Sequence, residues 1–167
     1  WDAVAQVLLQ GDHPRDEWSA HPGIMPVLDD ARIAWLKANK FHVGVSIDGT
    51  AVAQDACRRY VDGRSTHGDV EAGIRRALAA GLPLKTISVV DPTNSAELAG
   101  TLRYLVDIGV RDMSFNINYE ADWDDAARDA FRLHFHELTD AYIDIFRQGK
   151  IIKVNVLDAK VITHLKG

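Results

Sequence analysis

The stretch "VGVSIDGTAVAQDACRRYVDGRSTHGDVEAGIRRALAAGLPLKTISVV", residues 43–90, decides the fold class. It opens with the apolar alternation of a strand, which extends back to Phe41, and then enters a long polar loop from Asp48 to about His67. The next segment, residues 68–81, has helical spacing, with one apolar stripe formed by Val70, Ile74, Ala77 and Leu78. A β-branched run over 84–90 predicts a second strand. This order predicts a right-handed βαβ unit with parallel strands.

The same alternation continues on both sides of this unit. Toward the N-terminus, residues 29–40 form a predicted helix with Asp29 or Asp30 as its N-cap. Toward the C-terminus the predicted elements are a helix between Ser95 and Gly109, a strand over 110–118, a helix over 124–148, a strand over 150–156 and a helix over 158–166. Short returns after the helices, set against longer loops after the strands, favour an α/β barrel or half-barrel with one functional face.

Composition excludes several classes of protein. The formal net charge of −5 argues against a nucleic-acid surface, and no apolar run approaches the roughly 20 residues that span a membrane. The sequence shows no signal peptide, and its single cysteine, Cys57, can form neither an internal disulfide nor a metal site by itself. We therefore expect a cytoplasmic setting. Because the sequence starts at Trp1 rather than Met, we also expect a piece of a longer protein.

Polar residues stand at the end of each predicted strand. They are Ser46 and Asp48, then Asp91, then Asn116 and Asn118, and finally Asn155. In parallel α/β folds the ligands bind at the carboxyl ends of the strands, so these residues are candidates for a binding site. The alternative, that polar residues simply follow buried strands, stays open.

The polar loop after the first strand offers three kinds of chemistry. Asp48 and Asp55 could be a metal or acid–base pair, although Asp48-Gly49 is also a plain turn signature. Arginines converging on a serine hydroxyl would suit a carboxylate or phosphate, or could form a solvated charge cluster; the residues concerned are Ser46, Thr50, Arg58, Arg59 and Arg64. The arginines could also lower the pKa of Cys57, but no base for a nucleophile is placed nearby.

The remaining signals are weaker. The chain has seven histidines, and His134 and His136 are two residues apart on a predicted helix, so they do not face one ligand. The segment "GDHP" (11–14) is either a turn or a loop whose backbone meets a ligand. Phosphate-binding, dinucleotide-binding, zinc-protease and hydrolase motifs are absent from the sequence.

Taken in order, these motifs resemble the middle of a radical SAM enzyme. The resemblance is to the group with a C-terminal SPASM domain, which contains sulfatase maturases and peptide-modifying enzymes. The residues that carry it are the "SIDG" strand end, a following aspartate and arginine, and the helix that ends at Gly81; within it Ser46, Asp48, Gly49, Asp55 and Arg58 fall in the expected places. The resemblance extends over residues 29–167. It leaves 1–28 as a poorly defined N-terminal segment, for which a remnant of early barrel elements is one interpretation.

The resemblance implies a partial (β/α)6 TIM-like barrel that holds S-adenosylmethionine and a [4Fe-4S] cluster. The cluster would reduce the sulfonium, and the resulting 5′-deoxyadenosyl radical would abstract hydrogen from a peptide or protein substrate. By analogy Ser46 and Arg58 bind the methionine carboxylate, and Asn116 or Asn118 reaches the adenosine or the substrate.

The departures from the family pattern matter as well. The C-x-x-x-C-x-x-C loop that binds the cluster is absent, and the glycine-rich end of the second strand survives at most as "GDHP". The chain then corresponds to the central and C-terminal part of the barrel. Two alternatives remain, namely a degenerate, non-catalytic barrel that binds a peptide or a partner, and an unrelated barrel lyase or aldolase. The strand-end residues Ser, Asp and Asn do not favour the latter.

Overall fold

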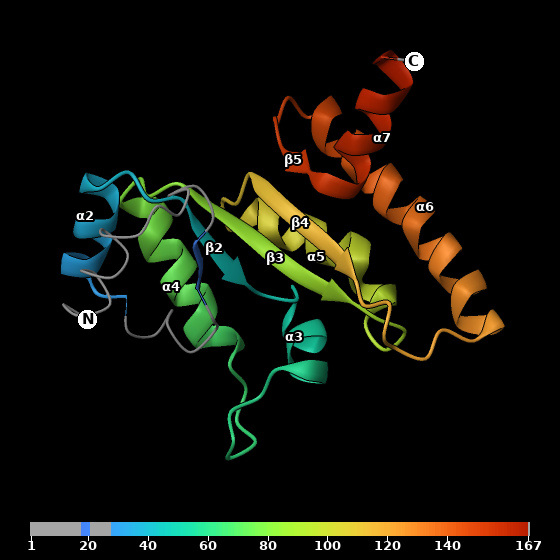
Figure 1. Cartoon of the computed structure of the whole chain (residues 1–167), viewed down its shortest axis with the longest axis horizontal. Helices are drawn as coiled ribbons and strands as arrows, with labels where there is room; N and C mark the ends of the chain where they lie inside the picture. The colour runs from blue at the N-terminus through green and yellow to red at the C-terminus, as the bar shows by residue number, and fades with distance from the viewer. Residues whose placement is uncertain (1–17, 21–27, 167) are drawn as a thin grey trace.

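The computed structural model describes residues 18–20 and 28–166 and shows one parallel sheet with the strands in sequential order. The strands are β1 (Trp18–Ala20), β2 (Val43–Ser46), β3 (Leu84–Val90), β4 (Asp112–Ile117) and β5 (Lys153–Val154). The helical elements are α2 (Asp30–Ala38), α3 (Ala51–Cys57), α4 (His67–Ala79), the short 3-10 helix η2 (Ser95–Glu97), α5 (Leu98–Asp107), α6 (Asp125–Arg147) and α7 (Asn155–Lys166) (Figure 1). The predicted class, an α/β partial barrel with parallel strands, is confirmed.

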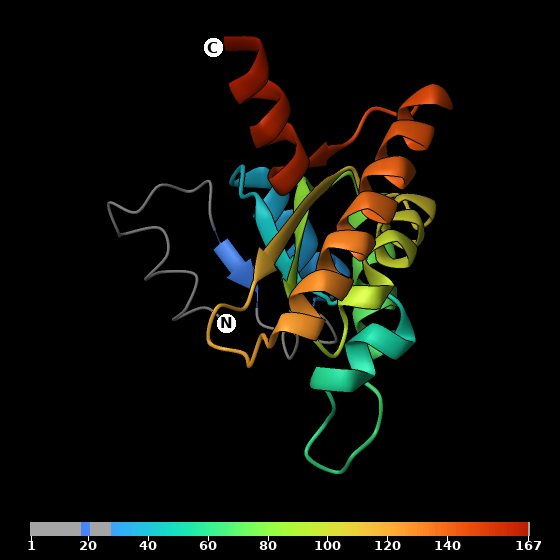
Figure 2. The ribbon, with the colours of Figure 1, turned by 90° about the vertical axis from the view of Figure 1, so that its right-hand side faces the viewer.

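The core lies between the sheet and its helices. Helices α4, α5 and α6 lie on one side of the sheet, the right-hand side in Figure 2. Alternate residues of β2, Val43 and Val45, are almost fully buried on that side, whereas Ser46 is only half-buried. The same period of two explains why the apolar positions of the sequence alternate. It also places Ser46, Ile87 and Ser114 in one row across three strands.

Four helix-to-strand turns are built in the same way. In each, a residue with positive φ follows the helix, donates its N–H three residues back, and is followed by a second N–H that bonds five residues back. These turns are at Lys40, Gly81, Gly109 and Gly149. A left-handed residue at this position ends a helix and satisfies its last carbonyl groups, which is why glycine marks helix ends in the sequence.

Two elements differ from the sequence prediction. Residues 51–57, expected within the polar loop, form α3, which Thr50 caps by accepting the N–H of Ala53. The predicted strand 150–156 is reduced to β5, because the Oδ1 of Asn155 takes the N–H of Phe115 that a longer strand would have bonded. Asn155 therefore starts α7 instead of ending a strand.

The two ends of the chain differ in their relation to the sheet. Most of the segment 1–28, including "GDHP", lies outside the described residues, but Trp18–Ala20 pairs in parallel with β2. Helix α7 projects away from the sheet (Figure 1), and all its described side chains from Ala159 onward are exposed. Within the described residues, none of the helices combines the length and apolarity needed to cross a membrane.

Candidate functional site

The carboxyl edge of the sheet gathers the residues that the sequence singled out. Strands β2, β3 and β4 are parallel neighbours, so Asp48, Asp91 and Asn118 all follow the same edge. The long strand-to-helix connections lie on this edge too, and one of them contains α3 (Figure 1). Ligands of parallel α/β folds bind at this edge.

Asp48 is the centre of a hydrogen-bond network at the end of β2. It is 5% exposed; its Oδ2 atom accepts from the Nε of Arg58 at 2.6 Å, and its Oδ1 atom accepts from the backbone N–H of Val89 at 3.0 Å. Its backbone N–H donates to the side chain of Gln54 at 2.8 Å, and its carbonyl accepts from Thr101. A buried carboxylate needs such pairing, because an unpaired one loses its hydration without compensation.

The network closes on itself through buried side chains. The amide of Gln54 donates to the hydroxyl of Thr66 at 3.0 Å, and that hydroxyl donates to the backbone carbonyl of Arg58 at 2.7 Å. The loop that carries Arg58 is thus tied to the strand end from two directions. Asp55, the other aspartate of this loop, accepts from Ser65 at 2.7 Å and pairs with Arg59 at 3.5 Å. Both aspartates therefore hold the loop in place.

Ser46 and Arg58 lie at the same edge, and Arg58 pairs with Asp48. The Arg58 side chain is 22% exposed and uses its Nε on Asp48, and no other side-chain hydrogen bond of Arg58 is formed with the described residues. The hydroxyl of Ser46 likewise bonds none of the described residues. This leaves N–H groups of the guanidinium and one hydroxyl for a ligand; that the ligand is a carboxylate remains a prediction.

The two asparagines at the end of β4 differ in availability. Asn116 is exposed, and only its Oδ1 is engaged, by the amide of Asn155 at 3.3 Å. Asn118 accepts the N–H of Glu120 with its side chain and the indole N–H of Trp123 with its carbonyl. Asn118 thus shapes the loop after β4, and Asn116 is the more accessible of the two.

Other candidate residues do not form a site. In the described part of the chain, no group of three His, Cys, Asp or Glu side chains could hold a metal ion. Cys57 lies with its Sγ 3.7 Å from Asp91 Oδ2, and burial together with the Asp91 carboxylate raises the pKa of the thiol. The lowering that the neighbouring arginines could have produced is therefore not found. His134 contacts the hydroxyl of Ser95, and no second histidine joins it among the described residues.

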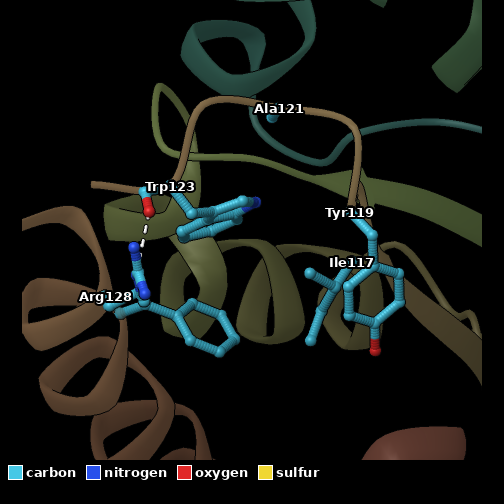
Figure 3. A pocket seen from close by; sticks show the side chains of 6 residues that line it. Ile117, Tyr119, Ala121, Trp123 and Arg128 are labelled. Carbon is cyan, nitrogen blue, oxygen red and sulfur yellow. Dashed lines mark hydrogen bonds between the residues drawn. The ribbon is translucent and has the colours of Figure 1, made fainter. Parts of the chain in front are cut away.

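An aromatic groove at the end of β4 was missed from the sequence. It has a volume of about 460 Å³ and is lined by Ile117, Tyr119, Ala121, Trp123, Arg128 and Phe131 (Figure 3). Trp123 packs edge-on against Phe131, with ring centroids 5.2 Å apart. The sequence did contain one signal for it: the five-residue loop "YEADW" (119–123) has two aromatic residues. A loop that only connects two elements does not need large aromatic side chains.

Comparison with solved structures adds a likeness of fold to this geometry. No protein-family model matches the sequence, and no curated protein matches it. Among solved structures, native anSMEcpe with bound AdoMet matches with a TM-score of 0.73 and 18% identity over 88% of this chain. The chain has the fold of part of a SPASM radical SAM enzyme. The complex of anSMEcpe with AdoMet and the Kp18Cys peptide matches with a TM-score of 0.69, also at 18% identity, over 84% of this chain.

The match covers only part of the relative. The chain spans 42% of the length of anSMEcpe in the AdoMet complex and 40% in the peptide complex. At 18% identity the likeness shows a common fold. It agrees with the resemblance drawn from the sequence, which was restricted to the central and C-terminal part of the barrel.

Proposed function

We propose that this chain is part of a radical SAM-type protein that modifies a peptide, and that the carboxyl edge of its sheet binds AdoMet. The observation that carries the proposal is the fold shared with an AdoMet-bound enzyme, combined with Ser46 and Arg58 at the edge where ligands of such folds bind. The peptide substrate is inferred from the relative, whose structures include bound peptides. The functional unit in this proposal is residues 29–167, with β1 added at its edge.

The residues at the end of β2 fit the carboxylate of AdoMet. A guanidinium recognises a carboxylate through paired N–H groups, and a serine hydroxyl adds a further donor. Asp48 holds Arg58 at its Nε, so the remaining N–H groups have a fixed orientation before a ligand arrives. Such preorganisation lowers the entropy cost of binding. In this proposal Asn116 contributes to the adenosine or substrate side of the same edge.

The residues do not fit a [4Fe-4S] cluster. A cluster needs several thiolates, and the 167 residues contain one cysteine; the pKa of its thiol is raised by burial and by the neighbouring Asp91 carboxylate. Thiolates from outside this sequence would have to supply the ligands. We therefore derive no reaction step through the cluster, and the role proposed for these residues is binding and orientation.

The single cysteine also favours a second candidate function. A barrel that kept its scaffold but lost the cluster would bind a peptide or a partner without radical chemistry. Such a protein would need the fold and the strand-end surface, both of which the structure contains, but neither AdoMet nor iron.

Calorimetric titration with AdoMet separates the two candidates. We expect binding to the protein that contains this chain, and we expect Ser46→Ala and Arg58→Ala each to weaken it about 10-fold, because each removes a charge-assisted hydrogen bond. Arg64→Ala is the matched control, because Arg64 bonds Asp62 on an exposed loop. Equal AdoMet affinity in all three variants would contradict the assignment. Peptide binding without any AdoMet binding would establish the second candidate.

A further inference from the structure

The groove at the end of β4 is a preformed surface. The indole N–H of Trp123 donates to the carbonyl of Asn118 at 2.7 Å, and the ring rests on Phe131. On the same side of the groove Arg128 donates from its Nε to the carbonyl of Trp123 at 2.8 Å, and Ile117 and Tyr119 lie on the opposite side (Figure 3). These bonds fix the loop and the first turns of α6 relative to each other, so the walls do not have to be ordered on binding.

The lining of the groove is mostly apolar and partly exposed. Tyr119 is 84% exposed. A tyrosine ring so exposed adds little to the stability of the fold, and a polar side chain would serve a plain surface loop equally well. Aromatic residues that flank an open groove are the usual anchors of recognition surfaces, because they bury a large area at low entropy cost. A volume of about 460 Å³ accommodates one large side chain with adjoining backbone.

The rim of the groove is acidic. Four exposed carboxylates belong to the loop and the start of α6: Glu120, Asp122, Asp124 and Asp125. Arg128, the one cation of the lining, lies 3.6 Å from Asp125 and offsets one of these four carboxylates, so a negative excess remains at the rim. An anionic ligand is therefore disfavoured at this groove, and a cationic one is attracted to it.

From this combination we propose that the groove binds a peptide segment in which an apolar or aromatic side chain is flanked by lysine or arginine. The apolar side chain would rest against Tyr119, Trp123 and Phe131, and the flanking cations would face the carboxylates of the rim. The identification of the occupant as a peptide rests on the proposed function. The groove lies on the loop that leaves the candidate edge at Asn118, so a peptide anchored in it would pass close to that edge.

The test uses two-dimensional NMR of the full-length protein with the indole N–H of Trp123 as the reporter, assigned with Trp123→Phe. The probe is the capped peptide Gly-Lys-Phe-Lys-Gly, and the comparison peptides are Gly-Glu-Phe-Glu-Gly and Gly-Lys-Ser-Lys-Gly. We expect the probe to shift the Trp123 signal and to bind about 10-fold more tightly than either comparison peptide. Its affinity should fall as ionic strength rises, because the rim is exposed to solvent.

Variants separate the apolar anchor from the acidic rim. Tyr119→Ala should weaken probe binding about 10-fold without unfolding the protein, because its side chain is exposed. Asp122→Asn combined with Asp125→Asn should weaken it about 3-fold at low salt only. Asp144→Asn is the matched control, because Asp144 forms the same kind of pair, with Arg147, near the other end of α6. Its affinity for the probe should equal that of the unmodified protein.

The outcomes also distinguish this inference from the proposed function. Probe binding that depends on Tyr119, in a protein that does not bind AdoMet, would support the groove and count against the AdoMet assignment. A Trp123 signal that AdoMet shifts and the probe does not would overturn the inference in favour of a cofactor subsite. Equal binding of all three peptides, or no effect of Tyr119→Ala, would overturn it as well.

Discussion

The two ends of the candidate edge differ in the kind of side chain that they carry and in how far it is buried. At the end of β2 the polar groups of Asp48, Gln54 and Thr66 are buried and bonded to one another. At the end of β4 an aromatic side chain, Tyr119, is left exposed above a groove, and its neighbours are bonded through backbone carbonyl groups.

This difference separates residues that fix the conformation of the edge from residues that are available to bind another molecule. Buried polar groups that satisfy each other specify one conformation, and the loss of any partner leaves the others unpaired. Exposed aromatic groups contribute little to folding and remain available for another molecule. Substitutions within the buried network at the end of β2 should therefore lower stability, whereas substitution of the exposed aromatic side chain at the groove should change binding with little effect on stability.

The largest effect is expected at Gly49, next to Asp48. Its φ is +118°, and a Cβ there would lie 2.0 Å from the hydroxyl oxygen of Thr101. Gly49→Ala should lower the free energy of unfolding by about 4 kcal/mol, measured by urea denaturation, because backbone strain and overlap add. Gly63→Ala is the control: its φ is +83°, but the space is open, so only about 1 kcal/mol should be lost. Equal losses in the two variants would show that Thr101 moves aside.

A smaller loss is expected when the centre of the network is removed. Asp48→Ala should cost about 3 kcal/mol, because it leaves Arg58 and the N–H of Val89 without their acceptor in a buried setting. Asp48→Asn keeps the shape and should cost less. If Asp48→Ala unfolds at the same urea concentration as the unmodified protein, the network does not hold the loop.

The smallest effect on stability is expected at the groove. Tyr119→Ala should leave the free energy of unfolding within about 0.5 kcal/mol of the unmodified protein, since its ring is exposed. Thermal denaturation followed by circular dichroism is a sufficient measurement. A clear loss of stability would mean that Tyr119 belongs to the core, and the contrast between the two ends of the edge would disappear.

The elements that the sequence predicted well are those with local chemical signals. Asp29, one of the two expected caps, caps α2, because a carboxylate at that position accepts an N–H of the first turn. Gly81 and Gly109 end their helices because they adopt positive φ. Helix α3 was missed since its seven residues are too few to show a period, and β5 was overestimated because the side chain of Asn155 replaces a backbone partner.

The candidate site was predictable in composition but not in its connections. The strand-end residues follow from the alternation of elements, and the structure places them at one edge. No pattern in the sequence indicates that Asp48 pairs with Arg58, because most of the residues between them fold into a helix, Ala51–Cys57, that was not expected. The groove depends on how residues 117–131 turn, and that geometry is set by bonds to backbone carbonyls, which residue identity does not reveal.

The turn at Lys40 has a consequence for how this scaffold tolerates change. Three of the four repeated turns use glycine, while Lys40 adopts a φ of 59° with a side chain attached. A left-handed lysine costs roughly 1 kcal/mol that glycine avoids. Replacing Lys40 with glycine should therefore raise the stability of the fold without changing either end of the candidate edge.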